Sequence, residues 1–129
     1  MGNFWPASGG VYVFERGAPG WDYIEEIPSP LTGTDISFGS DIAIQGDRAV
    51  VGASTAPGSV DTGKGAVYVF ERTPGGWALD ATLVSNSLDQ QLGAAVALDG
   101  NTIVAGAPES PPFQFGSAYV FFKTMNSGW

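Results

Sequence analysis

One strand-like segment occurs three times along the chain of 129 residues, near its beginning, middle and end. Residues 9–16 read GGVYVFER, residues 65–72 read GAVYVFER, and residues 116–123 read GSAYVFFK. Apolar side chains occupy both faces of each copy, because aliphatic and aromatic residues alternate along it. A strand that is apolar on both faces lies between two layers. We therefore expect each copy, called strand C, to be enclosed by neighbouring sheets.

A second type of segment, called strand D, follows the first two copies of strand C. It is predicted at 21–27 (WDYIEEI) and at 77–83 (WALDATL). In the second of these, alternation places Asp80 and Thr82 on a solvated face, which is typical of an outer strand. The opposite, apolar face is expected to carry Trp77, Leu79, Ala81 and Leu83.

Two further types of strand complete the pattern. Strand A is predicted at 38–44 (FGSDIAI) and 92–98 (LGAAVAL), and its small residues suit a position where backbones crowd near a central axis. Strand B is predicted at 48–53 (RAVVGA) and 102–107 (TIVAGA). Turns rich in Gly, Asp and Asn, which tight hairpins require, join strands A and B.

The order A-B-C-D repeats with a period of between 51 and 56 residues. Four-stranded units that run from a crowded inner strand to a solvated outer strand are the blades of a β-propeller. The predicted fold is all-β, with blades of four antiparallel strands and about two and a quarter repeats in the chain. We expect one partial propeller over 1–129, with units at about 10–37 (partial), 38–91 and 92–129 (partial). The residues that mark the repeat are Tyr12, Phe14, Trp21, Phe38, Gly39, Gly52, Tyr68, Phe70, Trp77, Gly93, Gly106, Tyr119 and Phe121.

Composition restricts the chemistry of the chain. Thirteen acidic and five basic residues give a net charge of −8, which argues against nucleic acid and anionic membranes as partners. The absence of Cys and His excludes disulfides and His-based acid–base catalysis. No apolar run approaches the roughly 20 residues of a membrane helix, and residues 1–10 lack a signal-peptide layout. We expect no cofactor, no catalytic residues and no membrane insertion.

The recurring residues resemble a known family. Phe38-Gly39 in strand A, Gly106-Ala107-Pro108 in strand B and GAVYVF at 65–70 in strand C are similar to FG-GAP repeats. The resemblance covers residues 10–123. FG-GAP repeats build the seven-bladed propeller head of integrin α subunits and occur in many bacterial surface and secreted proteins. The resemblance therefore implies a binding or adhesion role and an extracellular or cell-surface location.

The chain departs from the integrin-type repeat in the loop between strands A and B. There the integrin-type repeat carries alternating Asp and Asn residues that bind calcium, whereas this chain has IQGDRAV at 44–50 and LDGNTIV at 98–104. One or two side chains cannot supply the roughly six to eight oxygens that Ca²⁺ requires. We interpret Asp47, Asp99 and Asn101 as turn formers and expect the calcium-loop-less bacterial type, without a metal site.

The long connections are the candidate ligand-binding elements. In a propeller whose strand A is innermost, the D-to-A and B-to-C connections share one rim, and long loops on a rigid scaffold commonly carry function. These connections span 28–37, 54–64, 84–91 and 108–115. The candidate ligand-binding residues on them are Asp35, Asp61, Lys64, Asp89, Gln90, Glu109, Phe113, Gln114 and Phe115.

Several of these residues have a second interpretation. Phe113 and Phe115 suit contact with a protein or stacking on a sugar ring, but large aromatic side chains also pack between blades. Asp35, Asp61 and Asp89 give the rim a negative charge for cationic partners, or they cap turns. The Trp residues at the start of strand D are expected to pack each blade against its neighbour.

One copy of the chain cannot close a propeller ring. It holds nine predicted strands in the order C-D, A-B-C-D, A-B-C, with Trp129 as the beginning of a last strand D. A seven-bladed ring would need roughly 380 residues, and open strand edges favour association. We expect a piece of a longer protein or a head-to-tail homo-oligomer, in which the N-terminal C-D of one copy completes the A-B of the next. Two blades per copy would give six blades in a trimer, which we favour, or eight in a tetramer.

The predicted function is a non-enzymatic binding or adhesion module for proteins or glycans, which acts through the D–A and B–C loops. An alternative is a self-assembling propeller fragment, natural or engineered, with a purely structural role. A remote alternative is a glycan-active enzyme. Adjacent strand residues such as Glu25 and Glu26 point to opposite faces, so they cannot form the facing carboxylate pair that such an enzyme needs.

Overall fold

The structure is a computed structural model that describes residues 9–30, 37–54, 65–85, 91–108 and 115–129. No helix in these residues is long and apolar enough to cross a membrane. Short runs of β-branched and aromatic residues between turn residues favour strands, and these runs form them here. The strands are β1 (Gly10–Arg16), β2 (Trp21–Pro28), β3 (Phe38–Gln45), β4 (Arg48–Ala53), β5 (Ala66–Thr73), β6 (Gly76–Leu83), β7 (Ala95–Asp99), β8 (Thr102–Ala107) and β9 (Ser117–Phe122).

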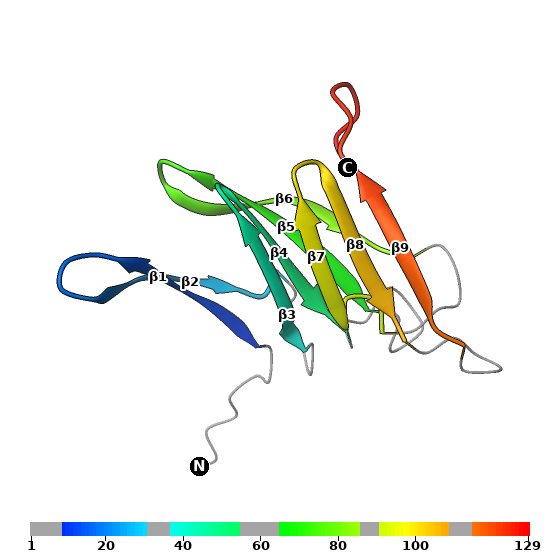
Figure 1. The fold of residues 1–129 in the computed structure, drawn as a ribbon, viewed down its shortest axis with the longest axis horizontal. Helices are drawn as coiled ribbons and strands as arrows, with labels where there is room; N and C mark the ends of the chain where they lie inside the picture. The colour runs from blue at the N-terminus through cyan, green and yellow to red at the C-terminus, as the bar shows by residue number, and fades with distance from the viewer. Residues whose placement is uncertain (1–8, 31–36, 55–64, 86–90, 109–114) are drawn as a thin grey trace, which may run out of the picture.

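The strands form three antiparallel sheets that follow one another across the molecule (Figure 1). The first sheet has the order β1-β2, the second β3-β4-β5-β6, and the third β7-β8-β9. This is the predicted succession C-D, A-B-C-D, A-B-C, so the second sheet is a complete four-stranded blade and its neighbours are partial blades. The all-β fold is confirmed, and the described sheets form an open array.

Two hydrophobic cores join the three sheets, one on each face of the second sheet. The first core lies between the first and second sheets, and the second core lies between the second and third sheets. β5 contributes Tyr68 and Phe70 to the first core and Val67 and Val69 to the second. Phe38 packs edge-on against Tyr68 and Phe70, with ring centroids 5.7 and 6.1 Å apart. The middle copy of strand C is thus enclosed on both faces, as predicted.

A β-bulge changes the faces expected for strand D. The register of β5 against β6 shifts between Val69 and Phe70, and Asp80 is the extra residue on β6. Side chains on the two sides of this bulge therefore point to opposite faces. Trp77 packs against the first core, whereas Leu83 belongs to the second core. The prediction that the apolar residues of 77–83 share one face is wrong for this reason.

Gly39 and Gly93 explain the glycine of the strand A motif. Both have φ of 92°, in the left-handed region that glycine adopts without a Cβ clash. The turn at Gly93 also shortens the strand expected at 92–98, because β7 begins only at Ala95. In the second sheet, β3 includes its motif from Phe38 onward, and its register against β4 is irregular over these residues.

The chain reverses direction after β9. The Thr124 N–H donates to the Gly128 carbonyl oxygen at 2.8 Å, and the two residues form an isolated antiparallel bridge. Trp129 follows this turn and packs partly against the second core. This turn lies at the place of the predicted C–D connection, and the beginning of a last strand D at Trp129 stays a prediction.

Candidate interaction surfaces

The strand ends that flank the long connections lie along one edge of the sheets, the lower edge in Figure 1. In this view β4 and β8 end at the lower edge, and because neighbouring strands are antiparallel, β6 ends on the same side of its sheet as β4, and β2 ends beside the start of β1. The tight A–B and C–D turns lie away from this edge. The four D–A and B–C connections therefore leave the sheets from one rim.

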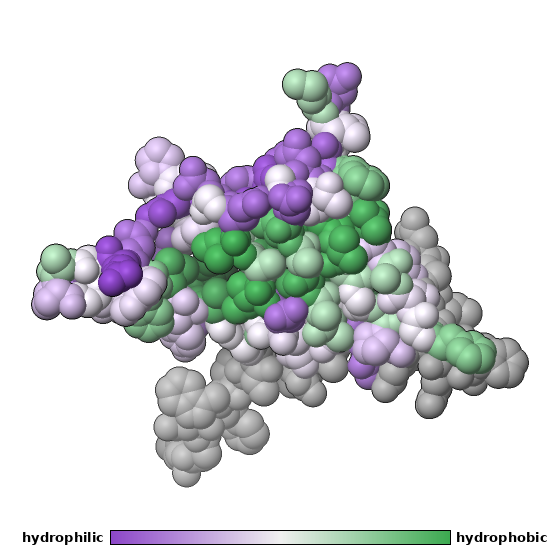
Figure 2. Space-filling view, in the orientation of Figure 1, coloured by the Kyte–Doolittle hydropathy of each residue, from purple (hydrophilic) through white to green (hydrophobic). Residues whose placement is uncertain are grey.

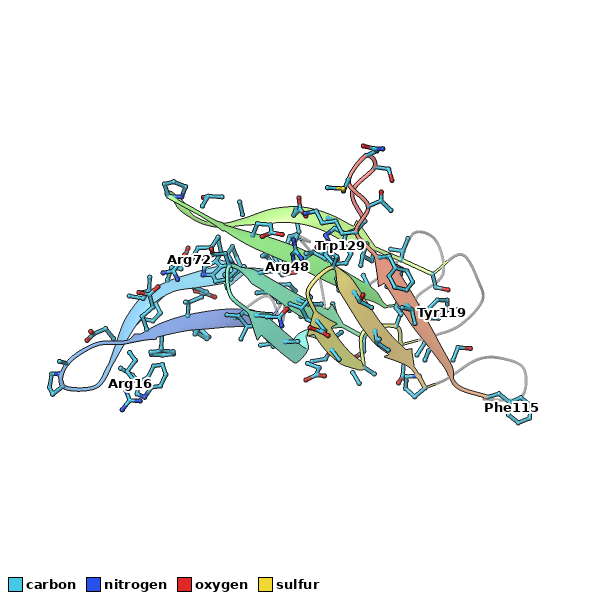
Figure 3. The ribbon with its side chains drawn as sticks, turned by 45° about the horizontal axis from the view of Figure 1, so that its top comes forward. Arg16, Arg48, Arg72, Phe115, Tyr119 and Trp129 are labelled. Atoms are coloured by element: carbon cyan, nitrogen blue, oxygen red, sulfur yellow. The ribbon has the colours of Figure 1, made fainter. Side chains whose placement is uncertain are left out.

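Phe115 is the predicted ligand-binding residue that lies within the described part of the chain. Its side chain is 72% exposed and lies just before β9 at one extremity of the molecule (Figure 3). The ring is therefore not enclosed between the described sheets, and its role in ligand binding stays a prediction. The remaining predicted residues lie outside the described ranges: Asp35, Asp61, Lys64, Asp89, Gln90, Glu109, Phe113 and Gln114.

The face of the first sheet that points away from the second is rich in aromatic side chains. Tyr12 and Phe14 are 59% and 53% exposed. Tyr23 lies beside both, with ring centroids 6.5 Å from Tyr12 and 5.7 Å from Phe14, and Trp21 is also exposed. We call these four side chains the N-terminal end face. Within one copy, β1 is enclosed on one face only and Trp21 is exposed, so the predicted second neighbour of β1 and the packing of Trp21 between blades stay predictions for an assembled ring.

The outer face of the third sheet is also apolar and exposed. Val104 of β8 and Val120 and Phe122 of β9 form this C-terminal end face. The opposite side of β9 carries Tyr119 and Phe121, which pack against the second core. Strand β9 is thus enclosed on one face only, unlike its equivalent β5.

An apolar groove of about 200 Å³ lies between β1 and β3, beside a first sheet that holds β1 and β2 within the described residues. Ile42 and Ile44 of β3 line the groove and are 45% and 64% exposed. Their equivalents one repeat later, Val96 and Leu98, pack against the second core. Figure 2 shows a hydrophobic area in the middle of the view, over the region of β3 and β7.

Charged residues link the second and third sheets. Lys123 Nζ lies 3.0 Å from Asp80 Oδ2 and 3.5 Å from Glu71 Oε1. The Trp129 indole N–H donates to the same Asp80 oxygen at 3.2 Å. The Asp80 carboxylate at the bulge of β6 therefore holds both a cation and an indole of the next sheet.

An equivalent ion pair links the first and second sheets. Arg72, which occupies the repeat position of Lys123, pairs with Glu15, which occupies that of Glu71. Arg16 is the third member of this basic series, and it lies beside the far end of the first sheet (Figure 3). Within the described residues Arg16 has no ion pair, and the third sheet has Phe122 at the glutamate position.

The A–B turns of the second and third sheets contact each other through hydrogen bonds. Arg48 Nη1 donates to the Gly100 carbonyl oxygen at 2.6 Å and to Asn101 Oδ1 at 3.3 Å. Gln45 accepts from the Gly100 N–H at 2.6 Å and donates to Asp99 Oδ1 at 3.4 Å. Among the described residues, no group of three metal-ligating side chains is arranged to hold an ion. The assignment to a calcium-loop-less type stays a prediction.

Tyr68 is a core residue with a perturbed acidity. Its side chain is only 2% exposed and packs against Phe38 in the first core. Burial raises the pKa of Tyr68 above the ordinary value of 10.0, because the phenolate would lose its hydration there. The phenol is therefore neutral at physiological pH.

Stacked antiparallel units with a crowded inner strand and an outer strand define a β-propeller-type protein. Residues 32–70 match a family model described as FG-GAP repeat, the family whose motifs the sequence resembles. Such repeats form propeller-type modules that are often involved in binding and are generally non-enzymatic. No curated protein matches the chain.

Sequence reasoning expected open edges and unpaired blade faces, but it did not identify the residues of the end faces, the groove or the charged pairs between sheets. Each becomes visible when residues one repeat apart are compared in the structure. Ile42 and Val96 share a repeat position, but only Val96 is covered by a neighbouring sheet. Within the described residues the first sheet holds β1 and β2 alone, so Ile42 and Ile44 of β3 stay partly exposed.

Proposed function

We propose that the chain is a non-enzymatic binding module that recognises a protein or glycan partner through its D–A and B–C rim, in an extracellular or cell-surface setting. Propeller-type repeats hold long loops at one edge of a rigid scaffold, which is a common arrangement for ligand recognition. The FG-GAP match supports the binding class. The rim, and not the hairpin edge, carries the connections that are long enough to form a contact surface.

The exposure of Phe115 is the observation that carries this proposal. A phenyl ring that is 72% exposed at the rim offers a large apolar surface, and such rings anchor protein contacts and stack on sugar rings. The ring lies where the B–C connection of the third sheet enters β9. A ligand at the rim would therefore meet it directly.

The test is binding of the purified chain to a glycan array and to a panel of immobilised extracellular proteins. Phe115→Ala is expected to weaken the strongest interaction at least about tenfold, the effect of removing an interface anchor. Phe122→Ala is the matched control, because Phe122 is also an exposed phenylalanine but lies on the C-terminal end face. Equal losses in the two variants, or binding unaffected by Phe115→Ala, would contradict the proposal.

A second candidate function, self-assembly of propeller fragments, is favoured by the two exposed end faces. Tyr12, Phe14 and Trp21 at one end and Val120 and Phe122 at the other are apolar surfaces that a closed ring would cover. The expected result is a discrete ring, with three copies and six blades as the favoured state. Light scattering after size exclusion measures this mass, and a monomer at every concentration would reject it.

A further inference from the structure

We propose that the β1–β2 hairpin of one copy takes the place of β9 beside β8 of a second copy, so that each third sheet becomes a complete four-stranded blade. The proposal rests on the self-assembly candidate above and specifies its contacts. β8 has β7 on one side and a single strand C position on the other, which β9 occupies, and β9 and β1 are two copies of the same strand C. β1 brings β2, the strand D that the third sheet lacks.

The first support is the match between β1 and β9. Tyr12 and Phe14 of β1 occupy the repeat positions of Tyr119 and Phe121 of β9. Those two residues of β9 pack against the second core, whereas Tyr12 and Phe14 are exposed. After the exchange, the aromatic side chains of β1 would cover the second core of the neighbouring copy with the same residue types in the same register.

The second support is charge complementarity. Lys123 follows β9 and contacts Glu71 and Asp80, and its equivalent beside β1 is Arg16. Arg16 has no ion pair within the described residues. After the exchange it would lie beside the carboxylates of Glu71 and Asp80 of the neighbouring copy. Trp21 would likewise reach the position of Trp129, whose indole donates to Asp80.

The third support is the groove between β1 and β3. When β1 joins β7 and β8 of a second copy, these two strands enter the first blade at the positions of its missing strands A and B. Val104 of β8 would then face Ile42 and Ile44 of the other copy. The same contact exists one repeat away, where Val50, the equivalent of Val104, packs in the second core with Val96, the equivalent of Ile42. One arrangement thus covers the groove and the aromatic end face together.

Each copy has three strands C but completes only two blades, so one strand C is left over. In the exchange this strand is β9. Each copy would contribute its own second sheet and one shared blade, composed of β7 and β8 from one copy and β1 and β2 from the next. Three copies would close a ring of six complete blades, and β9 of every copy would be released. A second copy of this chain therefore provides both the strand that pairs with β8 and the side chains that cover the groove between β1 and β3.

The first experiment locks β9 in place with an engineered disulfide. Val104 and Val120 are directly paired in β8 and β9, and the chain has no native Cys, so Val104→Cys/Val120→Cys introduces the only thiols. We expect the oxidised variant to be monomeric by light scattering and the reduced variant to assemble like the wild type. An oxidised variant that keeps the wild-type oligomeric mass overturns the exchange but leaves self-assembly intact.

The second experiment detects the new strand pair directly. Val13 occupies the repeat position of Val120, so the exchange places Val13 of one copy opposite Val104 of the next. Mixing Val13→Cys with Val104→Cys chains, followed by oxidation or a short thiol-bridging reagent, should give a covalent heterodimer. Val13→Cys mixed with Val120→Cys is the matched control and should give no heterodimer. A heterodimer in the control mixture alone would overturn the proposal.

A charge reversal tests the predicted ion pair. Arg16→Glu would place a third carboxylate beside Glu71 and Asp80, so we expect the Kd for assembly to rise at least about tenfold. Arg16→Lys restores the residue type found at Lys123 and should assemble with nearly the wild-type Kd. Equal assembly of the two variants would overturn this contact. A wild-type chain that stays monomeric at all concentrations rejects self-assembly and the exchange together, and assigns the groove to strands from another polypeptide segment.

Discussion

The middle copy of the repeated strand and its two terminal copies have nearly the same sequence but very different surroundings. In β5, Tyr68 and Phe70 are 2% and 3% exposed, whereas the equivalent Tyr12 and Phe14 of β1 are more than half exposed. The same alternation of apolar residues thus forms a strand at each position, but the number of neighbouring sheets decides its burial. A strand that is apolar on both faces is fully buried only when a sheet packs on each face. At the two ends of this array, the described residues provide a sheet on one face only.

Truncating equivalent aromatic residues in the two regions should give the largest contrast. Phe70→Ala is expected to lower the free energy of unfolding by about 3–5 kcal/mol, because it removes a ring from the first core and leaves a cavity. Phe14→Ala should cost about 1 kcal/mol or less in the monomer, since that ring is half exposed. Urea unfolding at the lowest practical protein concentration measures both. Equal losses would mean that Phe14 is already covered in solution.

Adding a methyl group at equivalent glycines should give an intermediate contrast. A Cβ at Gly52 would collide with the backbone carbonyl oxygen of Gly93 in the next sheet, whereas a Cβ at Gly106 would meet the Ala95 Cβ at an ordinary 3.8 Å. Gly52→Ala is expected to destabilise the chain by about 1–3 kcal/mol, the usual cost of overpacking. Gly106→Ala should be nearly neutral in the monomer. Thermal unfolding of both variants checks this, and a neutral Gly52→Ala would mean that the second and third sheets pack less closely.

Much of the fold could be predicted from the sequence because the signals are local. Strand positions, turn glycines and the order A-B-C-D follow from alternation and period, and they agree with the three sheets. The bulge at Asp80 could not be found this way, because an extra residue on one strand is defined only by its partner strand. Alternation counted along strand D therefore assigned Trp77 and Leu83 to the same face.

The interaction surfaces were harder to predict than the fold. Trp21 and Trp77 occupy the same repeat position, yet Trp77 packs against the first core and Trp21 is exposed. No local pattern distinguishes them, because the difference lies in the sheet that each one faces. The predicted rim residues are mostly outside the described part of the chain, and Phe115, which lies within it, is exposed, so the ligand-binding role of the rim stays a prediction.

Removing the cation at equivalent positions should change the free energy of unfolding slightly at Lys123, which lies between two sheets, and not at Arg16, which lies at the end of the array. Lys123→Met is expected to lower the free energy of unfolding by up to about 1 kcal/mol, because Lys123 contacts two partly exposed carboxylates. Arg16→Met should leave the monomer unchanged, since Arg16 has no ion pair among the described residues. The Lys123 effect should shrink in high salt, where exposed charges are screened. Unfolding at low and high ionic strength measures it, and a salt-independent loss would indicate a packing role for the lysine stem.

The smallest expected effect concerns the acidity of Tyr68 in the enclosed strand. Burial raises the pKa of the folded-state phenol above 10.0, so the unfolded chain releases this proton at lower pH than the folded chain. The contribution of Tyr68 to stability is therefore fully present below pH 10 and is lost as the pH rises through the folded-state pKa. Tyr68→Phe should consequently show a shallower loss of stability than the wild type in urea unfolding between about pH 9 and 11. Parallel pH profiles for the two chains would mean that the enclosed strand opens enough to hydrate its phenolate before the chain unfolds.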